Sequence, residues 1–510
     1  MSETIFDIAI IGGGVNGCGI ARDAAGRGMS VLLAEQRDLA SATSSASTKL
    51  IHGGLRYLEH FEFRLVRESL LEREVMLAMA PHIVRPLRFI LPHHEALRPV
   101  WLIRLGLFLY DHLGARKLLP RSRAVTLKRG GLGDPLKPGF TRGFEYWDCR
   151  VDDARLVVLN AMDAARHGAE IRVRTEVVSA ARENGRWRVR LTDMRTGRRE
   201  TISARVLINA AGPWISEVIS KRIGLRSRYR TRLVKGSHIV VPRIFPQDHA
   251  YIFQNADQRI IFAIPYEHDF TLIGTTDVDF EDDPALVKIS ADEIVYLCEA
   301  AGEYFSAPIR PGDVVWSYAG LRPLYEETGD DETSAQETTR GYELDLLAAP
   351  DQPPLLNVFG GKLTTYRCLA EEALEMLKGW LPELGGEWTR NSSLPGGDFA
   401  AKAFDSMAEG LQANFPMVDA PLARRLAHAY GTLAREMLAG AETAGELGIH
   451  FGAGLYQREV EYLVNHEWAA SAEDVLWRRT KLGLRFSAAE AERLERWLKE
   501  KFPEIAISPA

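Results

Sequence analysis

The fold of this chain is decided by residues 5–17, which read Ile5-Phe6-Asp7-Ile8-Ala9-Ile10-Ile11-Gly12-Gly13-Gly14-Val15-Asn16-Gly17. The apolar run predicts a strand, and the glycines fit G-x-G-x-x-G, which predicts a tight turn and a helix over 15–27. The three glycines of that pattern permit the turn, let a pyrophosphate approach the backbone, and let helix and strand pack closely. The helix N-terminus directs free N–H groups at the phosphates. We therefore expect dinucleotide contacts at Gly12, Gly14, Asn16 and Gly17, the alternative being a glycine turn without a ligand.

A carboxylate ends the second predicted strand, which covers residues 30–34. Glu35 stands close to the interval of about 20 residues at which a carboxylate bonds the ribose hydroxyls, and it would repel the 2′-phosphate of NADP. FAD and NAD remain. The hydroxyl-rich run 41–48 suits the phosphates and ribityl chain of a long cofactor, although a solvated loop has the same composition. The cofactor contacts expected here are Glu35, Thr43, Ser44, Ser45 and Lys49.

The whole chain limits the class of protein. Its 510 residues exceed the ~250–300 that one hydrophobic core supports, so two or three domains are expected. The net charge of -6 gives no global attraction to nucleic acid, and four scattered cysteines indicate neither a disulfide framework nor a metal site. The first residues lack the order of a secretory signal, so we expect a cytoplasmic protein. The apolar stretch 99–113 is shorter than the ~20 residues that span a bilayer.

Several segments resemble those of FAD-dependent, membrane-associated glycerol-3-phosphate dehydrogenases. The most distinctive is Ser44-Ser45-Ala46-Ser47-Thr48-Lys49-Leu50-Ile51-His52-Gly53-Gly54-Leu55-Arg56-Tyr57-Leu58. The similarity covers nearly the whole chain. Its other segments are 142–146 (RGFEY), 151–156 (VDDARL), 235–242 (KGSHIVVP), 273–277 (IGTTD), 320–324 (GLRPL), 358–367 (VFGGKLTTYR) and 476–481 (LWRRTK).

The resemblance implies a fold, a cofactor and partners. It implies noncovalent FAD, oxidation of sn-glycerol 3-phosphate to dihydroxyacetone phosphate, a membrane quinone as electron acceptor, and peripheral attachment to the cytoplasmic face of the inner membrane. The expected fold is α/β, with a doubly wound, Rossmann-like FAD-binding domain of the glutathione-reductase and D-amino-acid-oxidase type. It is accompanied by an antiparallel-sheet substrate domain and a helical C-terminal domain. The expected boundaries are 1–80, 145–230 and 346–385 for the FAD domain, 81–144 and 231–345 for the substrate domain, and 395–510 for the helical domain.

Two later strand-to-turn junctions fit an FAD site, because cofactors lie beyond the carboxyl ends of the strands in doubly wound sheets. A strand over 206–209 runs into the first junction, and a strand over 355–359 runs into the second. The second precedes a helix whose N-terminus would face the flavin pyrimidine ring and stabilise the negative charge of reduced flavin. The expected contacts are Ala211, Gly212 and Trp214 at the first junction, and Gly361, Lys362, Leu363 and Thr364 at the second.

Oxidation of a secondary alcohol needs a base, and histidine with a pKa near ~6.5 suits that task. His52 is the preferred base and His238 is the second candidate. For each, the alternative is a histidine that only holds a loop in place by hydrogen bonds. A phosphate dianion matches guanidinium forks, and we expect Arg56 and Arg322 to bind it. Tyr57, Lys362 and, more weakly, Thr275 complete the expected substrate site.

Basic residues surround the apolar stretch 99–113. An apolar helix with basic flanks can lie in a bilayer interface, whereas a core helix beside a solvated loop is the structural alternative. The family's peripheral membrane habit favours the first. The cations are Arg98, Arg104, Arg116, Lys117, Arg121, Arg123, Lys128 and Arg129.

Residues 400–510 have helical spacing, with no role evident beyond capping or oligomerisation, and a homodimer is an open alternative.

Three rival functions share the cofactor fingerprint. An oxidase of glycerol 3-phosphate would pass electrons to oxygen and make peroxide. An amine-oxidising flavoprotein would use the same arginines to hold a carboxylate. A non-enzymatic FAD-binding sensor would need neither His52 nor the paired arginines, so their presence argues against it.

Overall fold

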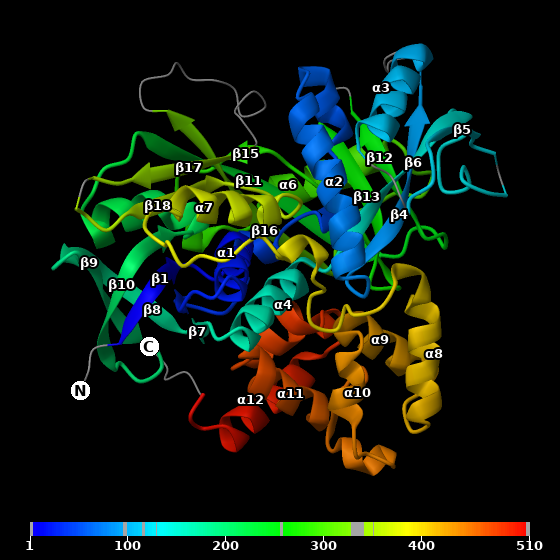
Figure 1. The fold of residues 1–510 in the computed structure, drawn as a ribbon. Helices are drawn as coiled ribbons and strands as arrows, with labels where there is room; N and C mark the ends of the chain where they lie inside the picture. Colours follow the sequence, from blue (N-terminus) through cyan, green and yellow to red (C-terminus); the bar gives the residue numbers. More distant parts are fainter. Residues whose placement is uncertain are drawn as a thin grey trace.

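The computed structural model describes residues 4–94, 99–114, 118–128, 130–255, 259–327, 341–349 and 351–505. Of the cations expected around the apolar stretch, Arg98, Arg116, Lys117 and Arg129 lie outside these residues. The chain builds two large sheets and a set of C-terminal helices (Figure 1).

The first sheet is the doubly wound sheet that the glycine turn predicts. Its strand order is β17-β18-β10-β1-β2-β7, and β1 pairs in parallel with both β2 and β10. The antiparallel pair β8 and β9 extends it through β10. The strands are β1 (Ile5–Ile11), β2 (Val31–Ala34), β7 (Glu170–Arg172), β8 (Thr175–Glu183), β9 (Arg186–Asp193), β10 (Arg199–Asn209), β17 (Tyr342–Leu347) and β18 (Leu355–Gly360).

Alternate residues of β1 face two different cores, as the period of a strand requires. Ile8 and Ile10 pack with α1, α4 and α7 on one side, whereas Ala9 and Ile11 pack with β8 and β9 on the other. Helix α1 lies between α4 and α7 and presents small residues to both. These helices are α1 (Val15–Gly26), α4 (Asp153–Arg166) and α7 (Tyr366–Leu377).

The second sheet is mostly antiparallel, as expected for a substrate domain. Its order is β15-β11-β14-β13-β12-β4-β6-β3, with β16 beside β11 and β5 beside β6. Helix α6 covers one face, and α2 and α3 cover the other. The elements are β3 (Leu50–Ile51), α2 (Phe63–Met79), β4 (Val84–His93), α3 (Val100–Leu113), β5 (Arg123–Thr126), β6 (Arg142–Val151), β11 (Tyr229–Pro242), β12 (His249–Gln254), β13 (Ile260–Tyr266), β14 (Phe270–Gly274), β15 (Val278–Asp279), α6 (Ala291–Gly302) and β16 (Trp316–Glu327).

The chain alternates between the two sheets, so the predicted divisions do not all fall in loops. The one at residue 145 lies inside β6, and the one at 345 lies inside β17. Hydrogen bonds join β6 to β4 along its whole length and place it in the second sheet. A local sequence pattern cannot reveal which sheet a strand joins, because this depends on partners elsewhere in the chain. β3 and β4 lie within the first 94 residues and yet belong to the second sheet.

The C-terminal residues form helices, as predicted, together with a short hairpin that the sequence did not suggest. Their apolar core is continuous with the core beneath α1 and α4. In Figure 1 these helices lie at the opposite end of the molecule from α2 and α3. The elements are α8 (Phe404–Asn414), α9 (Ala420–Tyr430), α10 (Leu433–Leu438), β19 (His450–Gly452), β20 (Leu455–Tyr456), α11 (Gln457–Glu467), a single π-helical turn η10 (Asp474–Arg479) and α12 (Ala488–Lys501).

Candidate active site

A cavity of about 540 Å³ opens beyond the carboxyl ends of β1, β10 and β18. Doubly wound sheets bind ligands at this edge because strand ends and helix N-termini meet there. Most of the predicted site residues line this cavity. They are Gly12, Gly14, Asn16, Glu35, Thr43, Ser44, His52, Tyr57, Ala211, Gly212, Trp214, His238, Arg322, Gly361, Lys362, Leu363 and Thr364. Five others do not line it: Gly17, Ser45, Lys49, Arg56 and Thr275.

The glycine turn has no room for side chains. Gly12 has φ +110°, and a Cβ there would lie 2.5 Å from the carbonyl oxygen of Ala210. A Cβ on Gly17 would lie 2.0 Å from the carbonyl oxygen of Gly12. Gly17 therefore serves close packing rather than direct contact with the cavity, which is the task the fingerprint gives to its third glycine.

The carboxylate of Glu35 holds this turn in place. The Gly13 N–H donates to Oε2 at 2.8 Å, and the Arg37 N–H donates to Oε1 at 2.7 Å. Burial raises the pKa of Glu35, and these two donors oppose the rise. The same carboxylate lines the cavity. The Glu35 carboxylate can therefore accept hydrogen bonds from a ribose while it also accepts the two backbone N–H bonds that hold the turn.

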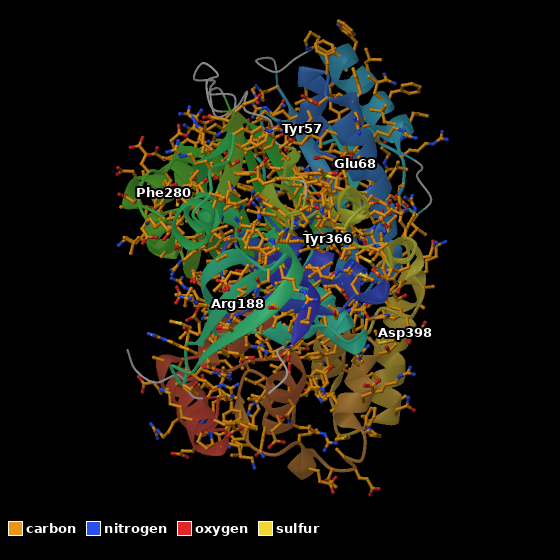
Figure 2. The ribbon with its side chains drawn as sticks, turned by 60° about the vertical axis from the view of Figure 1, so that its left-hand side comes forward. Tyr57, Glu68, Arg188, Phe280, Tyr366 and Asp398 are labelled. Atoms are coloured by element: carbon orange, nitrogen blue, oxygen red, sulfur yellow. The ribbon has the colours of Figure 1, made fainter. Side chains whose placement is uncertain are left out.

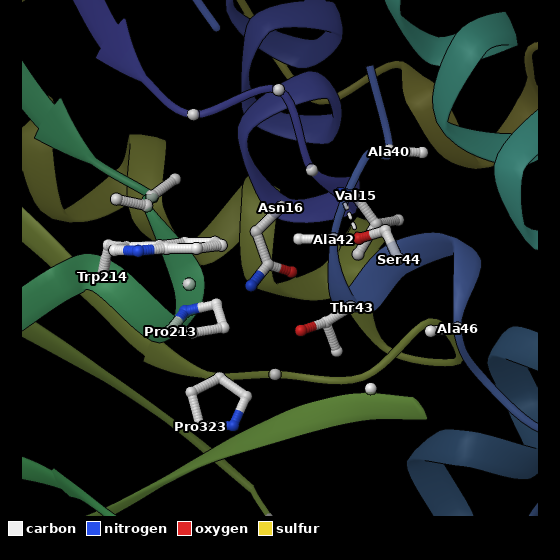
Figure 3. A pocket seen from close by; sticks show the side chains of 18 of the residues that line it. Val15, Asn16, Ala40, Ala42, Thr43, Ser44, Ala46, Pro213, Trp214 and Pro323 are labelled. Atoms are coloured by element: carbon white, nitrogen blue, oxygen red, sulfur yellow. Dashed lines mark hydrogen bonds between the residues drawn. The ribbon is translucent and has the colours of Figure 1, made fainter. Parts of the chain in front are cut away.

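Polar groups converge in the middle of the cavity (Figure 3). The Asn16 side chain points into the space between Trp214 and Thr43. Its Nδ2 donates to the Gly360 carbonyl at 3.1 Å, and its Oδ1 is buried without a hydrogen-bond partner in the described part of the chain. The Ser44 hydroxyl accepts from the Val15 N–H at 3.0 Å. An unsatisfied polar atom in a backbone cradle fits a long polar cofactor, because buried polar groups are otherwise paired.

Lys49 is committed to another partner. Its Nζ lies 2.9 Å from both carboxylate oxygens of buried Asp153 and 2.9 Å from the Ser45 carbonyl. The Ser47 hydroxyl donates to the same carboxylate at 2.7 Å. The ammonium therefore shapes the hydroxyl-rich loop from behind instead of reaching into the cavity. The resemblance of this segment to the family does not distinguish a lysine that contacts the cofactor from one that supports the loop.

Lys362 also lines the cavity and directly follows the Gly360–Gly361 turn. Both glycines have positive φ, +70° and +90°, so the chain turns sharply before α7 begins at Tyr366. The Lys362 Nζ is buried with no hydrogen-bond partner among the described residues, and it lies 4.2 Å from the centre of the Tyr57 ring. A buried ammonium without an acceptor is costly. The site is therefore built to receive a negative group.

The backbone next to His52 is held by a buried chain of hydrogen bonds that the sequence did not indicate. The N–H of the next residue, Gly53, donates to the Tyr110 hydroxyl at 2.8 Å, and Tyr110 donates to Asp148 at 2.7 Å. Arg73 donates to Asp148 at 2.6 Å. Burial lowers the pKa of His52; Lys362 and Arg73 add to this, and Asp148 opposes it. A neutral His52 lining the cavity can accept a proton.

His238 is the more constrained histidine. Its Nε2 lies 2.9 Å from the Thr48 hydroxyl, and its ring stacks on Tyr318 at 4.8 Å between centroids. Gly274 packs so closely that a Cβ there would lie 2.1 Å from the ring. Burial lowers the pKa of His238 well below its ordinary value, with Arg322 and Lys49 adding to the effect. Its Nδ1 is buried without a hydrogen-bond partner in the described chain.

Arg322 reaches the cavity from β16. Its Nη1 pairs with Asp277, and its Nη2 donates to the Thr275 hydroxyl at 3.1 Å. Thr275 thus orients the arginine from outside the cavity. Asp277 belongs to the segment 273–277 that resembles the family, but the sequence does not indicate that it pairs with Arg322. The feature that could have indicated this pairing is an acidic residue two positions after Thr275 in the segment.

Comparisons with known proteins agree with this geometry. The family model described as FAD dependent oxidoreductase matches residues 7–367, and the model described as C-terminal domain of alpha-glycerophosphate oxidase matches residues 388–500. A glycerol-3-phosphate dehydrogenase of Pseudomonas aeruginosa is 52% identical over 499 residues, which are 98% of this chain and 96% of the relative. The D-erythritol 1-phosphate dehydrogenase of Brucella abortus is 50% identical over 96% of this chain and 97% of its own.

A solved structure agrees as well. It is the glycerol-3-phosphate dehydrogenase from Bacillus halodurans complexed with FAD, which is 30% identical with a TM-score of 0.77. The match covers 99% of this chain and 92% of the solved one. The prediction of an FAD fold with a helical C-terminal domain is confirmed.

Proposed function

This chain belongs to the FAD-dependent glycerol-3-phosphate dehydrogenase family, and from that membership we propose that it oxidises sn-glycerol 3-phosphate to dihydroxyacetone phosphate. One observation supports this substrate class most directly. Lys362, whose buried ammonium has no hydrogen-bond partner among the described residues, lines the same cavity as Arg322 and two histidines whose pKa values are lowered. A phosphate monoester and a secondary alcohol are the groups that such a set recognises.

His52 is our proposed proton acceptor. It lines the cavity, and burial lowers the pKa of its ring, which favours the neutral form. The proton leaves the hydroxyl oxygen of the substrate as the hydride leaves the carbon that carries this oxygen. The base must therefore be neutral when substrate binds, because only a neutral imidazole can accept the proton. Bound FAD supplies the hydride acceptor. His238 remains the alternative base, although its Nε2 already faces Thr48.

The phosphate is proposed to lie against Arg322, Lys362 and Tyr57. Arg322 is pre-oriented by Thr275 and Asp277, which lowers the entropic cost of holding an anion. Thr275 is accordingly proposed as a positioning residue for Arg322. Arg56, next to Tyr57 in the chain, stays a proposed phosphate ligand.

A rate comparison tests the substrate. The D-erythritol 1-phosphate dehydrogenase relative makes the longer polyol phosphate the sharpest rival. Purified enzyme is mixed anaerobically with glycerol 3-phosphate, D-erythritol 1-phosphate or an N-methylated amino acid, and the second-order rate of flavin reduction is compared. We expect glycerol 3-phosphate to be fastest. Faster reduction by D-erythritol 1-phosphate would reassign the substrate, and reduction by the amine would overturn the phosphate site.

The electron acceptor is proposed to be a membrane quinone. Exposed residues on and just before α2 and α3 support contact with a lipid surface at this end of the molecule. Trp101, Leu105 and Phe108 lie on one face of α3 and are 67%, 47% and 56% exposed, and Phe61 is 78% exposed just before α2. Exposed apolar residues gathered in this way mark an interaction site, and anionic headgroups attract the arginines beside them. The exposed arginines on these two helices are Arg64, Arg67 and Arg104.

The geometry of the whole molecule suits this attachment. Figure 2 shows Tyr57 and Glu68 toward the end that carries α2 and α3, and Asp398 toward the C-terminal helices. The cavity residue Tyr57 is thus near the proposed membrane face. No helix of the described chain is long and apolar enough to cross a bilayer, so attachment to the cytoplasmic face would be peripheral.

Oxygen is the competing acceptor. Enzyme with glycerol 3-phosphate in air, with and without a soluble quinone, separates the two. Quinone reduction with little peroxide is the expected result, whereas rapid peroxide formation without quinone would make the protein an oxidase.

A further inference from the structure

The segment Leu476–Lys481, which resembles the family, has no task in the chemistry above. It overlaps η10 of the C-terminal helices and lies against the FAD-binding unit. We call residues 474–479 the docking turn. Its contacts with the FAD-binding unit are ion pairs between buried side chains, which is unusual because charged residues are seldom buried.

Asp38 is the first anchor of the docking turn. It is fully buried, three residues after Glu35. Arg479 holds it with two bonds, Nη1 to Oδ2 at 2.7 Å and Nη2 to Oδ1 at 2.8 Å, and Arg478 Nε lies 2.5 Å from Oδ2. These two arginines are its ion-pair partners among the described residues. Removing them would leave a buried carboxylate without compensation, which is strongly destabilising.

The backbone around Asp38 is part of the cofactor cradle. The Ser41 N–H donates to the Asp38 carbonyl at 3.2 Å, and the Ala40 N–H donates to the Gly13 carbonyl at 3.1 Å. Residues on both sides of Asp38, Arg37 and Ala40 among them, line the cavity. The position of Asp38 therefore sets both the glycine turn and the start of the hydroxyl-rich loop.

A second anchor holds the facing wall. Asp474 accepts from Arg174 Nη2 at 2.6 Å. Arg174 has φ +52° and its N–H donates to the Arg37 carbonyl at 2.9 Å, while the next residue, Thr175, lines the cavity and donates to the Glu35 carbonyl at 2.8 Å. Burial would raise the pKa of Asp474, but Arg478 and Arg174 hold it at about 2. The ion pair is therefore present throughout the neutral range.

We propose that the docking turn is a positioning element for FAD: through Asp38 and Arg174 it fixes the two turns that wall the Glu35 end of the cavity. Docking of the C-terminal helices and occupancy of the cofactor site then stabilise each other, because a coupling between two binding events is reciprocal. Asp38, Arg478 and Arg479 are positioning residues, since FAD is held by the turns that they fix.

The test is a titration of FAD into FAD-depleted full-length protein, with Asp38→Asn as the variant. Glu459→Gln is the matched control, because Glu459 is also buried, pairs with Arg425 within the C-terminal helices, and does not line the cavity. Both changes turn a buried carboxylate into an amide and should lower the Tm of the FAD-depleted protein. We expect only Asp38→Asn to raise the Kd for FAD, by at least about tenfold.

A second variant guards against loss of folding. Arg479→Lys keeps the charge but cannot make the two parallel bonds. In the unsubstituted protein, FAD should slow amide hydrogen exchange in residues 474–481, and in Arg479→Lys this protection should shrink. An unchanged Kd in Asp38→Asn, an equal rise in Glu459→Gln, or amide exchange in the docking turn that does not respond to FAD would each overturn the proposal.

Discussion

Lys362 places a positive charge in the wall of the cavity. Its buried Nζ has no hydrogen-bond partner among the described residues and lies 4.2 Å from the centre of the Tyr57 ring. We expect Lys362→Met to keep FAD bound and to lower kcat/KM for glycerol 3-phosphate by roughly 100-fold, the loss typical when one preorganised donor is removed from an active site. Steady-state kinetics with a quinone acceptor measure this. A kcat/KM within a factor of two of the unsubstituted value would remove Lys362 from the site.

The pH dependence of the reaction reports on the proposed base. An exposed imidazole titrates near ~6.5, and burial lowers the pKa of His52. Because the active form is neutral, activity should be retained as the pH falls through ~6.5 and be lost only below it. The acidic limb of kcat/KM against pH should therefore lie below that value. A limb above pH 6.5 would contradict a buried neutral base.

The same shift affects stability. A histidine with a lowered pKa in the folded state binds fewer protons there than in the unfolded chain. His52 and His238 both belong to this class. The free energy of unfolding should therefore fall as the pH drops below ~6.5. His238→Asn should weaken this dependence, which chemical denaturation at pH 5 and 7.5 can measure.

At the level of elements, α3 joins the outside of the molecule to the base. Its outer face carries Trp101 and Phe108, whereas its buried residue Tyr110 bonds both Gly53 and Asp148. Tyr110→Phe should lower kcat by about tenfold with KM and FAD affinity unchanged, because one unsatisfied buried donor costs ~1–3 kcal/mol and displaces the His52 backbone. Tyr266→Phe is the control, since the buried Tyr266 hydroxyl has no hydrogen-bond partner in the described chain. Equal effects of the two variants would mean that a lost hydroxyl, and not the Gly53 contact, is responsible.

The outer face of α3 has its own test. We expect Trp101→Ala with Phe108→Ala to reduce co-sedimentation with anionic phospholipid vesicles by at least about tenfold, because each aromatic side chain buries apolar area worth ~1.5–3 kcal/mol. Activity with a soluble quinone should stay unchanged. Leu286→Ala is a suitable control, because Leu286 is also exposed, at 68%, but lies between β15 and α6. Equal vesicle binding by the double variant would place the membrane surface elsewhere.

For the whole molecule, the sequence predicts what is local and misses what is distant. The strand, glycine turn and helix at residues 5–27 follow from neighbouring residues, and the structure agrees. The partner of Lys49 is 104 residues away, and Arg479 meets Asp38 across 441 residues. Charged residues carry no sign of their partners in a single sequence, so the ammonium of Lys49 was expected at the cofactor and is found on Asp153 instead.

The alternation of the chain between two sheets has the same cause. Strands of similar composition join different sheets according to distant pairings, as β6 does with β4. Site residues at strand ends were nonetheless predictable, because the carboxyl ends of parallel strands meet at one edge.

This chain has the fold of an FAD-dependent oxidoreductase, and we propose that glycerol 3-phosphate reduces its flavin. Anaerobic titration of the purified holoprotein, followed by the absorbance of the flavin, tests cofactor, substrate and direction of electron flow together. We expect glycerol 3-phosphate to bleach the oxidised flavin band and dihydroxyacetone phosphate to appear in an amount equal to the flavin reduced. A flavin that stays oxidised at saturating glycerol 3-phosphate, or a protein that carries no flavin, would contradict it.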